Sequence, residues 1–186
     1  AVTLGFNHYL IMSMKVNEAH AQMKLSGDLS QDVIAMTIFE GVPDIYGNEM
    51  GVQYEATQEA INIMKQYDPG YGNNKIMLEG EKLQRYIDVT TKISCEFCCG
   101  AKAISFADGR PACGCAHSQA MRGLAAYLLQ NHTDSYSNDE LLQELARWKG
   151  RYFPKQMINK MTTQISSGQY TPDVASLLLG IDVSQY

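Results

Sequence analysis

The five cysteines of this chain all lie within one short segment, from Cys95 to Cys115, and this clustering constrains the fold more than any other feature. An odd number of cysteines excludes complete pairing in internal disulfides. Disulfides that stabilise a fold usually close long loops between distant segments, which these residues do not do. The clustering therefore favours a metal site or a redox centre over a disulfide framework.

Length and composition agree with a protein that folds around its own hydrophobic core. The chain has 186 residues, of which 45% are hydrophobic and 19% are charged, values typical of a single globular domain or of one domain with an extended arm. The net charge is −5 and no run of Lys or Arg offsets it. Because a nucleic-acid or anionic-membrane partner requires a basic face, we expect no nucleic-acid partner.

The apolar pattern predicts a helical domain over residues 28–186. Helical periodicity, ended by Gly or Pro, predicts helices over 29–39, 52–67, 78–93, 118–130, 137–149, 154–166 and 171–180. Ser137 and Glu140 have the spacing of a capping box, and Pro154 fits the first position of a helix. Asp108-Gly109 between two short apolar runs predicts a hairpin. The predicted fold is all-α: a bundle of six or seven helices with a small Cys/His-rich hairpin loop and a long N-terminal helix.

The N-terminal residues, 1–27, are predicted to form a helical arm. Apolar residues recur with helical spacing from residue 2 to residue 25, and neither Pro nor a loop signal interrupts them. A helix of about 24 residues spans roughly 36 Å, which is long for a domain of this size. We therefore expect the arm to pack against a second copy of the chain, which makes a homo-oligomer the expected assembly.

The cysteine segment contains two short groups of soft metal ligands on either side of the predicted hairpin. The first group is the sequence CEFCCG from residue 95 to residue 100, and the second is CGCAH from residue 113 to residue 117. Each group presents ligands from a tight turn, and the hairpin brings the turns together. Gly100 and Gly114 stand where the backbone is expected to turn without a Cβ. The candidate metal ligands are Cys95, Cys98, Cys99, Cys113, Cys115 and His117.

The ligand set is larger than one tetrahedral ion requires, and several arrangements remain open. Six candidates stand where a tetrahedral ion takes four, and the spacing differs from that of a zinc ribbon. The neighbouring residues Cys98 and Cys99 cannot easily bind the same ion, because adjacent side chains diverge. The alternatives are one ion with spare thiols, a polynuclear thiolate cluster, or one ion with a disulfide such as Cys95 to Cys113. A disulfide-stapled or zinc-braced loop without chemistry of its own is the simplest interpretation.

The sequence from residue 78 to residue 156 resembles an uncharacterised family of bacterial and archaeal membrane-anchored extracytoplasmic proteins. The resemblance lies in CEFCCGAKAISFADGRPACGCAHSQAMRGLAAYLLQNH and the following SNDELLQELARWKGRYFPKQ, which contain a CC pair, a CxH pair, an AMxGL helix and an aromatic-Pro pair. It implies an export signal or membrane anchor ahead of an extracytoplasmic domain, and it transfers no catalytic role. Within this pattern Cys98, Cys99, Cys115 and His117 are the first candidates as ligands, and Cys95 and Cys113 are the second.

The absence of catalytic motifs favours a protein that is not an enzyme. The chain contains no GxSxG, P-loop, GxGxxG or HExxH motif. Thiolate ligands favour copper(I) or zinc, so we predict a metal-binding protein with a soft Cys/His site. One alternative is a redox or electron-transfer protein that uses thiol–disulfide exchange or an iron–sulfur cluster. The other is a structural, self-assembling subunit whose loop is braced by a metal or a disulfide.

The start of the chain bears on its location. Residue 1 is alanine, without an initiator methionine, which predicts that an export signal or anchor precedes it in the full gene product. Together with the family resemblance, this predicts a location outside the cytoplasm. Contact with a membrane is expected only through a segment upstream of Ala1.

Overall fold

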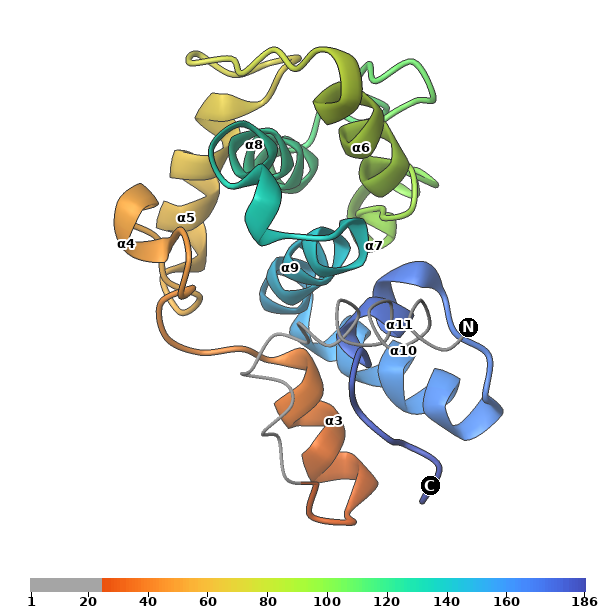
Figure 1. Ribbon diagram of the computed structural model, residues 1–186. Helices are drawn as coiled ribbons and strands as arrows, with labels where there is room; N and C mark the ends of the chain where they lie inside the picture. Colours follow the sequence, from red (N-terminus) through yellow and green to blue (C-terminus); the bar gives the residue numbers. More distant parts are fainter. Residues whose placement is uncertain (1–24) are drawn as a thin grey trace, which may run out of the picture.

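The computed structural model describes residues 25–186, and this part of the chain consists of helices joined by loops (Figure 1). The α-helices are α3 (Leu29–Thr37), α4 (Gly47–Met50), α5 (Thr57–Met64), α6 (Gly80–Thr90), α7 (Glu96–Cys99), α8 (Ala116–Asn131), α9 (Asn138–Tyr152), α10 (Pro154–Ser167) and α11 (Pro172–Leu177), with 3₁₀ helices η1 (Lys65–Tyr67) and η2 (Thr133–Ser135). No β-strand occurs between residues 25 and 186, which confirms the all-α prediction. Of the predicted N-terminal arm, residues 1–24 lie outside the described part.

The structure has more helices than the six or seven predicted for the chain, because α4 and α7 contain only four residues each. Helices this short leave no periodic pattern to detect. The helix predicted from residue 52 begins only at Thr57 and ends in the 3₁₀ turn η1. The segment before it is non-helical because Tyr54 is buried and its N–H donates to the carbonyl oxygen of Gly41.

Helix α8 lies at the centre of the fold. Figure 1 shows it almost end-on, with α5 on one side, α6 on the other and α9 next to it. Its residues from Ala120 to Leu129 are all buried, which agrees with their nearly unbroken apolar sequence. No helix in the described part is both long and apolar enough to cross a membrane.

A glycine allows α8 to pack closely against the junction of α5 and η1. A Cβ at Gly123 would lie 2.0 Å from the carbonyl oxygen of Met64. Only a residue without a side chain permits this approach, since real Cβ atoms do not come so near to a backbone oxygen. Gly123 therefore determines how closely the first half of the domain can approach the central helix.

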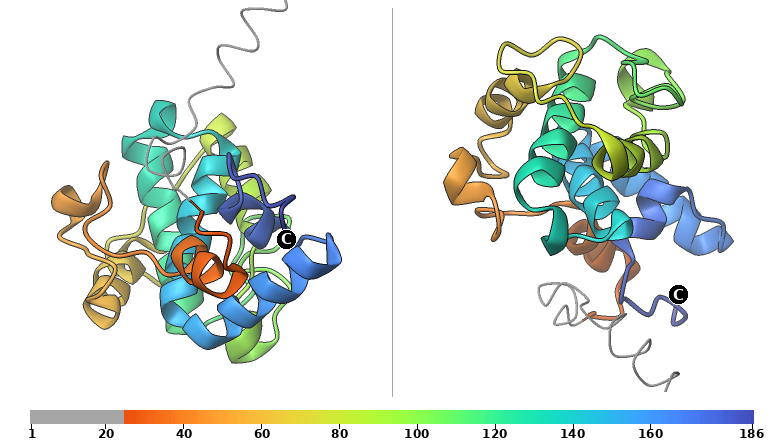
Figure 2. Two further views of the ribbon diagram at one scale, coloured as in Figure 1. Left: turned by 90° about the horizontal axis from the view of Figure 1, so that it is seen from below. Right: turned by 45° about the horizontal axis from the view of Figure 1, so that its top comes forward.

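Helix α9 is the second element of the core, and its N-terminus has the predicted cap. Ser137 Oγ accepts a hydrogen bond from the N–H of Glu140 at 3.2 Å, and the Glu140 carboxylate accepts one from the N–H of Ser137 at 2.7 Å. Pro154 occupies the first turn of α10, as predicted. Helices α3, α10 and α11 all contact α9. In the right-hand view of Figure 2, α3 lies toward the lower end of the molecule and α5 toward the upper end.

The predicted hairpin is present as a tight turn with a single antiparallel bridge, between Ser105 and Pro111. The N–H of Phe106 donates to the carbonyl oxygen of Arg110 at 2.8 Å. Gly109 adopts a φ of +81°, a conformation that favours glycine. The hairpin returns the chain to the start of α8. This return brings the ligand-rich segments 95–100 and 113–117 together.

Candidate metal centre

The candidate ligands come from two helix ends and the segment between them. Cys95 is the residue before α7, and Cys98 and Cys99 are on that helix. Cys113 follows the hairpin, and Cys115 caps the N-terminus of α8. The hairpin is fixed beside α7 because the N–H of Ile104 donates to the carbonyl oxygen of Ile93 at 2.9 Å.

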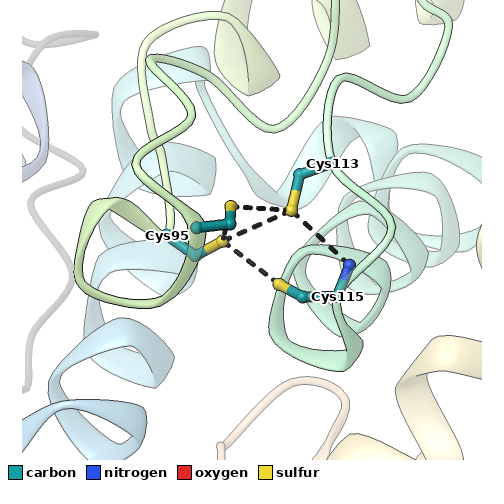
Figure 3. Close-up of side chains that lie close together, drawn as sticks. Cys95, Cys113 and Cys115 are labelled. Carbon is teal, nitrogen blue, oxygen red and sulfur yellow. Dashed lines mark hydrogen bonds between the residues drawn. The ribbon is translucent and has the colours of Figure 1, made fainter.

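Four sulfur atoms, one from each of Cys95, Cys99, Cys113 and Cys115, form one compact group. The four atoms all lie within 4.8 Å of one another. The Sγ atom of Cys95 lies 3.4 Å from that of Cys99, 3.9 Å from that of Cys113 and 3.2 Å from that of Cys115. The sulfurs of Cys99 and Cys113 are 2.8 Å apart. Figure 3 shows Cys95 on one side and Cys113 and Cys115 on the other, with their sulfurs directed toward one another.

These distances are close to those of a four-thiolate metal site. Zinc–sulfur bonds of about 2.3 Å in a tetrahedron place the sulfurs about 3.8 Å apart. The four sulfurs of this chain need to move by about 1 Å or less to surround such an ion. The group of Cys95, Cys99, Cys113 and Cys115 can therefore hold a metal ion.

The disulfide suggested between Cys95 and Cys113 is not formed in this structure. All five cysteines are free. The sulfurs of Cys95 and Cys113 are 3.9 Å apart, whereas a disulfide bond is about 2.05 Å long. Both residues were second candidates as ligands from the sequence, yet both lie in the four-sulfur group.

A second group contains Cys98, Cys115 and His117, whose ligand atoms also lie within 4.8 Å of one another. Cys115 belongs to both groups. The neighbouring residues Cys98 and Cys99 lie in different groups, in agreement with the expectation that adjacent cysteines diverge. Together the two groups contain all six candidate residues.

The thiol of Cys115 is the most acidic group of the cluster. Contact with the Cys95 thiol is the main cause that lowers its pKa to about 3, against the opposing effect of burial, and hydrogen bonds with Ser118 add to it. The backbone N–H of Ser118 donates to Cys115 Sγ at 3.4 Å, as expected at the N-terminus of a helix. The same contact with Cys115, together with burial, raises the pKa of Cys95 well above its ordinary value.

A buried arginine holds the backbone on one side of the cluster. The Arg122 guanidinium donates through Nη1 to the carbonyl oxygens of Ile104 at 2.8 Å and Cys113 at 2.9 Å. Its other nitrogens donate to the Asp68 carboxylate at 2.7 and 3.0 Å. Both charged side chains are fully buried, so their hydrogen bonds compensate for the loss of water.

A partly buried ion network holds α7 on the other side. Glu96 accepts hydrogen bonds from Lys149 at 2.7 Å and Lys160 at 2.6 Å. Both lysines also contact Asp173, at 2.6 and 2.9 Å. The carboxylate between Cys95 and Cys98 is thereby tied to α9, α10 and α11.

Sequence reasoning missed these supporting charges. For Arg122 a signal was present, because it is a lone arginine in the apolar run of α8. A charge at a position surrounded by core residues needs a partner. Lys149 stands in the last turn of a predicted helix, where lysine is ordinary, so nothing in the pattern marked it as buried.

The glycine at residue 114 differs from expectation. Gly100 ends α7 with a φ of +66°, a left-handed conformation that favours glycine, as predicted. Gly114 has no positive φ, and a Cβ there would meet nothing nearer than the Tyr71 hydroxyl at 4.0 Å. The turn between Cys113 and Cys115 is therefore possible for other residues.

Fold and site together define a helical, cysteine-rich protein with a cluster that can hold a metal ion. Comparison of the chain with family models, with curated proteins and with solved structures found no match. The family resemblance seen in the Cys/His pattern stays a prediction, and the chemistry of the cluster carries the functional inference.

Proposed function

We propose that this protein binds one zinc ion through the thiolates of Cys95, Cys99, Cys113 and Cys115. The observation that carries the proposal is the convergence of four sulfurs, from three chain segments, to within 4.8 Å of one another. Closed sites of four cysteine thiolates are typical of structural zinc. Copper(I), which the same soft ligands bind, is the alternative ion.

The compactness of the group supports a single ion rather than an iron–sulfur cluster. In an iron–sulfur cluster the four cysteines are divided among two or more iron atoms bridged by inorganic sulfide, so the sulfurs bound to different irons lie further apart than the ligands of one ion. Here Cys95 Sγ lies within 3.9 Å of the other three sulfurs. This spacing fits one central ion.

The proposed role of the ion is structural and non-enzymatic. Four protein ligands fill a tetrahedral coordination sphere, so no position is left for a substrate at this ion. The ion would join α7, the end of the hairpin and the N-terminus of α8. Because such a site does not exist in the unfolded chain, binding free energy becomes folding free energy.

Location and assembly are further parts of the proposal. The Cys/His resemblance supports a location outside the cytoplasm, where a bound ion would protect the clustered thiols from oxidation. The apolar pattern of residues 2–25 supports self-association of the chain. Removing residues 1–24, which spares the packed side chain of Leu25, should convert an oligomer to a monomer in sedimentation analysis. An unchanged mass would contradict the arm hypothesis.

A thiol–disulfide redox protein is the second candidate, and one observation favours it. The sulfurs of Cys99 and Cys113 lie 2.8 Å apart, and Cys99 is exposed. A disulfide oxidant such as oxidised glutathione would take two electrons and two protons from this pair as their disulfide forms. The pair could then cycle between thiol and disulfide.

Elemental analysis with a thiol count distinguishes the candidates. The protein purified without chelator should contain zinc in at least one equivalent and should be colourless, with its cysteines reduced. Cys99→Ser should remove this ion. His132→Ala is the control, because His132 belongs to neither ligand group and its substitution should leave all bound metal in place.

Two other results would contradict the zinc proposal. Protein with less than half an equivalent of any transition metal, and with thiols recovered as disulfides, would contradict the metal proposal and favour the redox candidate. Visible absorption from bound iron would instead favour an iron–sulfur cluster.

A further inference from the structure

The exposed thiol of Cys98 has ligand partners of its own. Cys98 is on α7 beside Cys99 but lies outside the four-sulfur group. Its Sγ atom and the ligand atoms of Cys115 and His117 lie within 4.8 Å of one another. One surface cysteine thus meets a thiol and an imidazole from the first turn of the central helix.

The side chain of His117 is held in place, and one of its ring nitrogens has no hydrogen-bond partner in the described part of the chain. Its ring packs against the rings of Phe153 and Tyr152, with centroids 4.8 and 5.2 Å away. The Nδ1 atom of His117 is buried and has no partner among the described residues. Leaving such an atom unpartnered costs free energy, so a missing partner is expected. A metal ion bound by the imidazole would be one.

We infer that Cys98, Cys115 and His117 form a second metal site, which shares the Cys115 thiolate with the four-thiolate site. The sharing rests on the proposed function, because it requires the first ion. Three protein ligands leave one tetrahedral position for water or an external ligand. Cys98 is exposed, so that position is accessible. The inner ion is structural and the outer ion is exchangeable.

Charge favours divalent ions in this pair of sites. The five thiolates carry a charge of −5 when all are ligands, and His117 binds as a neutral imidazole. Two divalent ions reduce the total to −1, whereas two copper(I) ions leave −3. A borderline ion such as Zn²⁺ also accepts mixed sulfur and nitrogen ligands. The outer site therefore fits a divalent ion in exchange with an external donor.

A bound water is the competing explanation for the unpartnered nitrogen. The hydroxyl of Tyr152, whose ring packs against His117, is also buried without a partner among residues 25–186. One water between these two groups would satisfy both of them. The two explanations differ in what His117 does for metal binding, so substitution separates them.

Stoichiometry and exchange test the second site. The full-length protein, reduced and saturated with Zn²⁺, is mixed with the chromophoric chelator 4-(2-pyridylazo)resorcinol. Two equivalents of zinc are expected, one released quickly and one retained until the thiols are modified. Cys98→Ser and His117→Gln should each lose only the fast equivalent. Cys99→Ser should lose the slow one, and Cys115→Ser should lose both.

The outcomes separate failure of this inference from failure of the proposed function. A single slow equivalent that Cys98→Ser and His117→Gln leave unchanged would overturn the second site and support the bound water. No bound zinc in the unsubstituted protein would overturn both. Cys98 is exposed, so its substitution should not disturb folding, and the far-ultraviolet circular dichroism of His117→Gln shows whether that variant has folded.

A separate measurement tests the shared thiolate. Replacing zinc by Co²⁺ places two paramagnetic ions on either side of Cys115 Sγ. The electron paramagnetic resonance signal per ion should fall when the second equivalent binds, because the two spins couple through the bridging sulfur. A constant signal per ion would overturn the sharing of Cys115.

Discussion

Arg122 donates a hydrogen bond to the backbone carbonyl oxygen of Cys113 at 2.9 Å, so a residue in the middle of the central helix fixes the segment between two candidate ligands. The same guanidinium holds the Asp68 carboxylate, and both side chains are fully buried. The cluster is thus supported from the core and not only by its own loop.

Replacing Arg122 by methionine should therefore weaken both the fold and the metal site. The change leaves the buried Asp68 carboxylate without its charged partner and with only the N–H of Gly70 donating to it, which costs about 3–5 kcal/mol. Metal affinity should fall as well, because the Cys113 backbone loses its anchor. Urea unfolding and zinc titration measure the two effects.

Arg110→Met on the hairpin is the control for this prediction. Arg110 pairs with Asp108, but both side chains are exposed, and an exposed pair contributes about 0–1 kcal/mol. Equal destabilisation by the two substitutions would contradict the proposed support from the core.

Removal of the metal should destabilise the loop around the cluster. Cys115→Ser should lower both bound zinc and the melting temperature, since Cys115 joins the four-sulfur group to the start of α8. In the unsubstituted protein a strong chelator should give a similar fall in melting temperature. Scanning calorimetry with and without chelator checks this.

His132→Ala provides the comparison for that experiment. His132 lies 2.9 Å from the half-exposed carboxylate of Glu49 and belongs to neither ligand group. The substitution should leave the amount of bound zinc unchanged and should lower the stability only slightly. A chelator that leaves the melting temperature of the unsubstituted protein unchanged would be evidence against a structural ion.

Asp173 should make the fold sensitive to acid. Burial raises the pKa of its carboxyl, but the charges of Lys149 and Lys160 and their hydrogen bonds outweigh burial and lower the pKa to about 2. The folded-state pKa is therefore below the unfolded value of about 3.9. Stability from this carboxylate is present above about pH 4 and is lost as the pH falls toward 2.

The corresponding variant is Asp173→Asn. It should lose roughly 2 kcal/mol of unfolding free energy at neutral pH, and the difference from the unsubstituted protein should shrink between about pH 4 and pH 2. Urea unfolding across this range, with chelator present for both proteins, measures the difference. Asp182→Asn changes an exposed carboxylate near the C-terminus and should have little effect. A difference independent of pH would show that Asp173 acts through packing rather than charge.

Gly123→Ala should be strongly destabilising, whereas Gly114→Ala should be tolerated. A Cβ at residue 123 meets the Met64 carbonyl oxygen at 2.0 Å, while a Cβ at residue 114 meets only the Tyr71 hydroxyl at 4.0 Å. Overpacking of this kind costs about 1–3 kcal/mol or more. Chemical denaturation of both variants tests the contrast. Equal stability of Gly123→Ala and Gly114→Ala would contradict the close packing of α8 against the Met64 carbonyl oxygen.

The sequence was sufficient for the features that depend on neighbouring residues. Helical periodicity, the Ser137–Glu140 capping box and Pro154 at the start of α10 are present as predicted, because hydrogen bonds within a few residues determine them. The density of cysteines likewise indicated the segment in which the sulfurs form a group that can hold a metal ion. Helix α7 was missed since a single turn has no period.

The arrangement of the ligands depended on tertiary structure. From the sequence alone Cys95 and Cys113 ranked below Cys98, yet they lie in the four-sulfur group and Cys98 lies in the other. The position of Cys113 is set by Arg122, which Asp68 holds from 54 residues away in sequence. Spacing along the chain locates a ligand-rich segment, but which sulfurs meet is decided by contacts between segments far apart in sequence, and those contacts exist only in the folded protein.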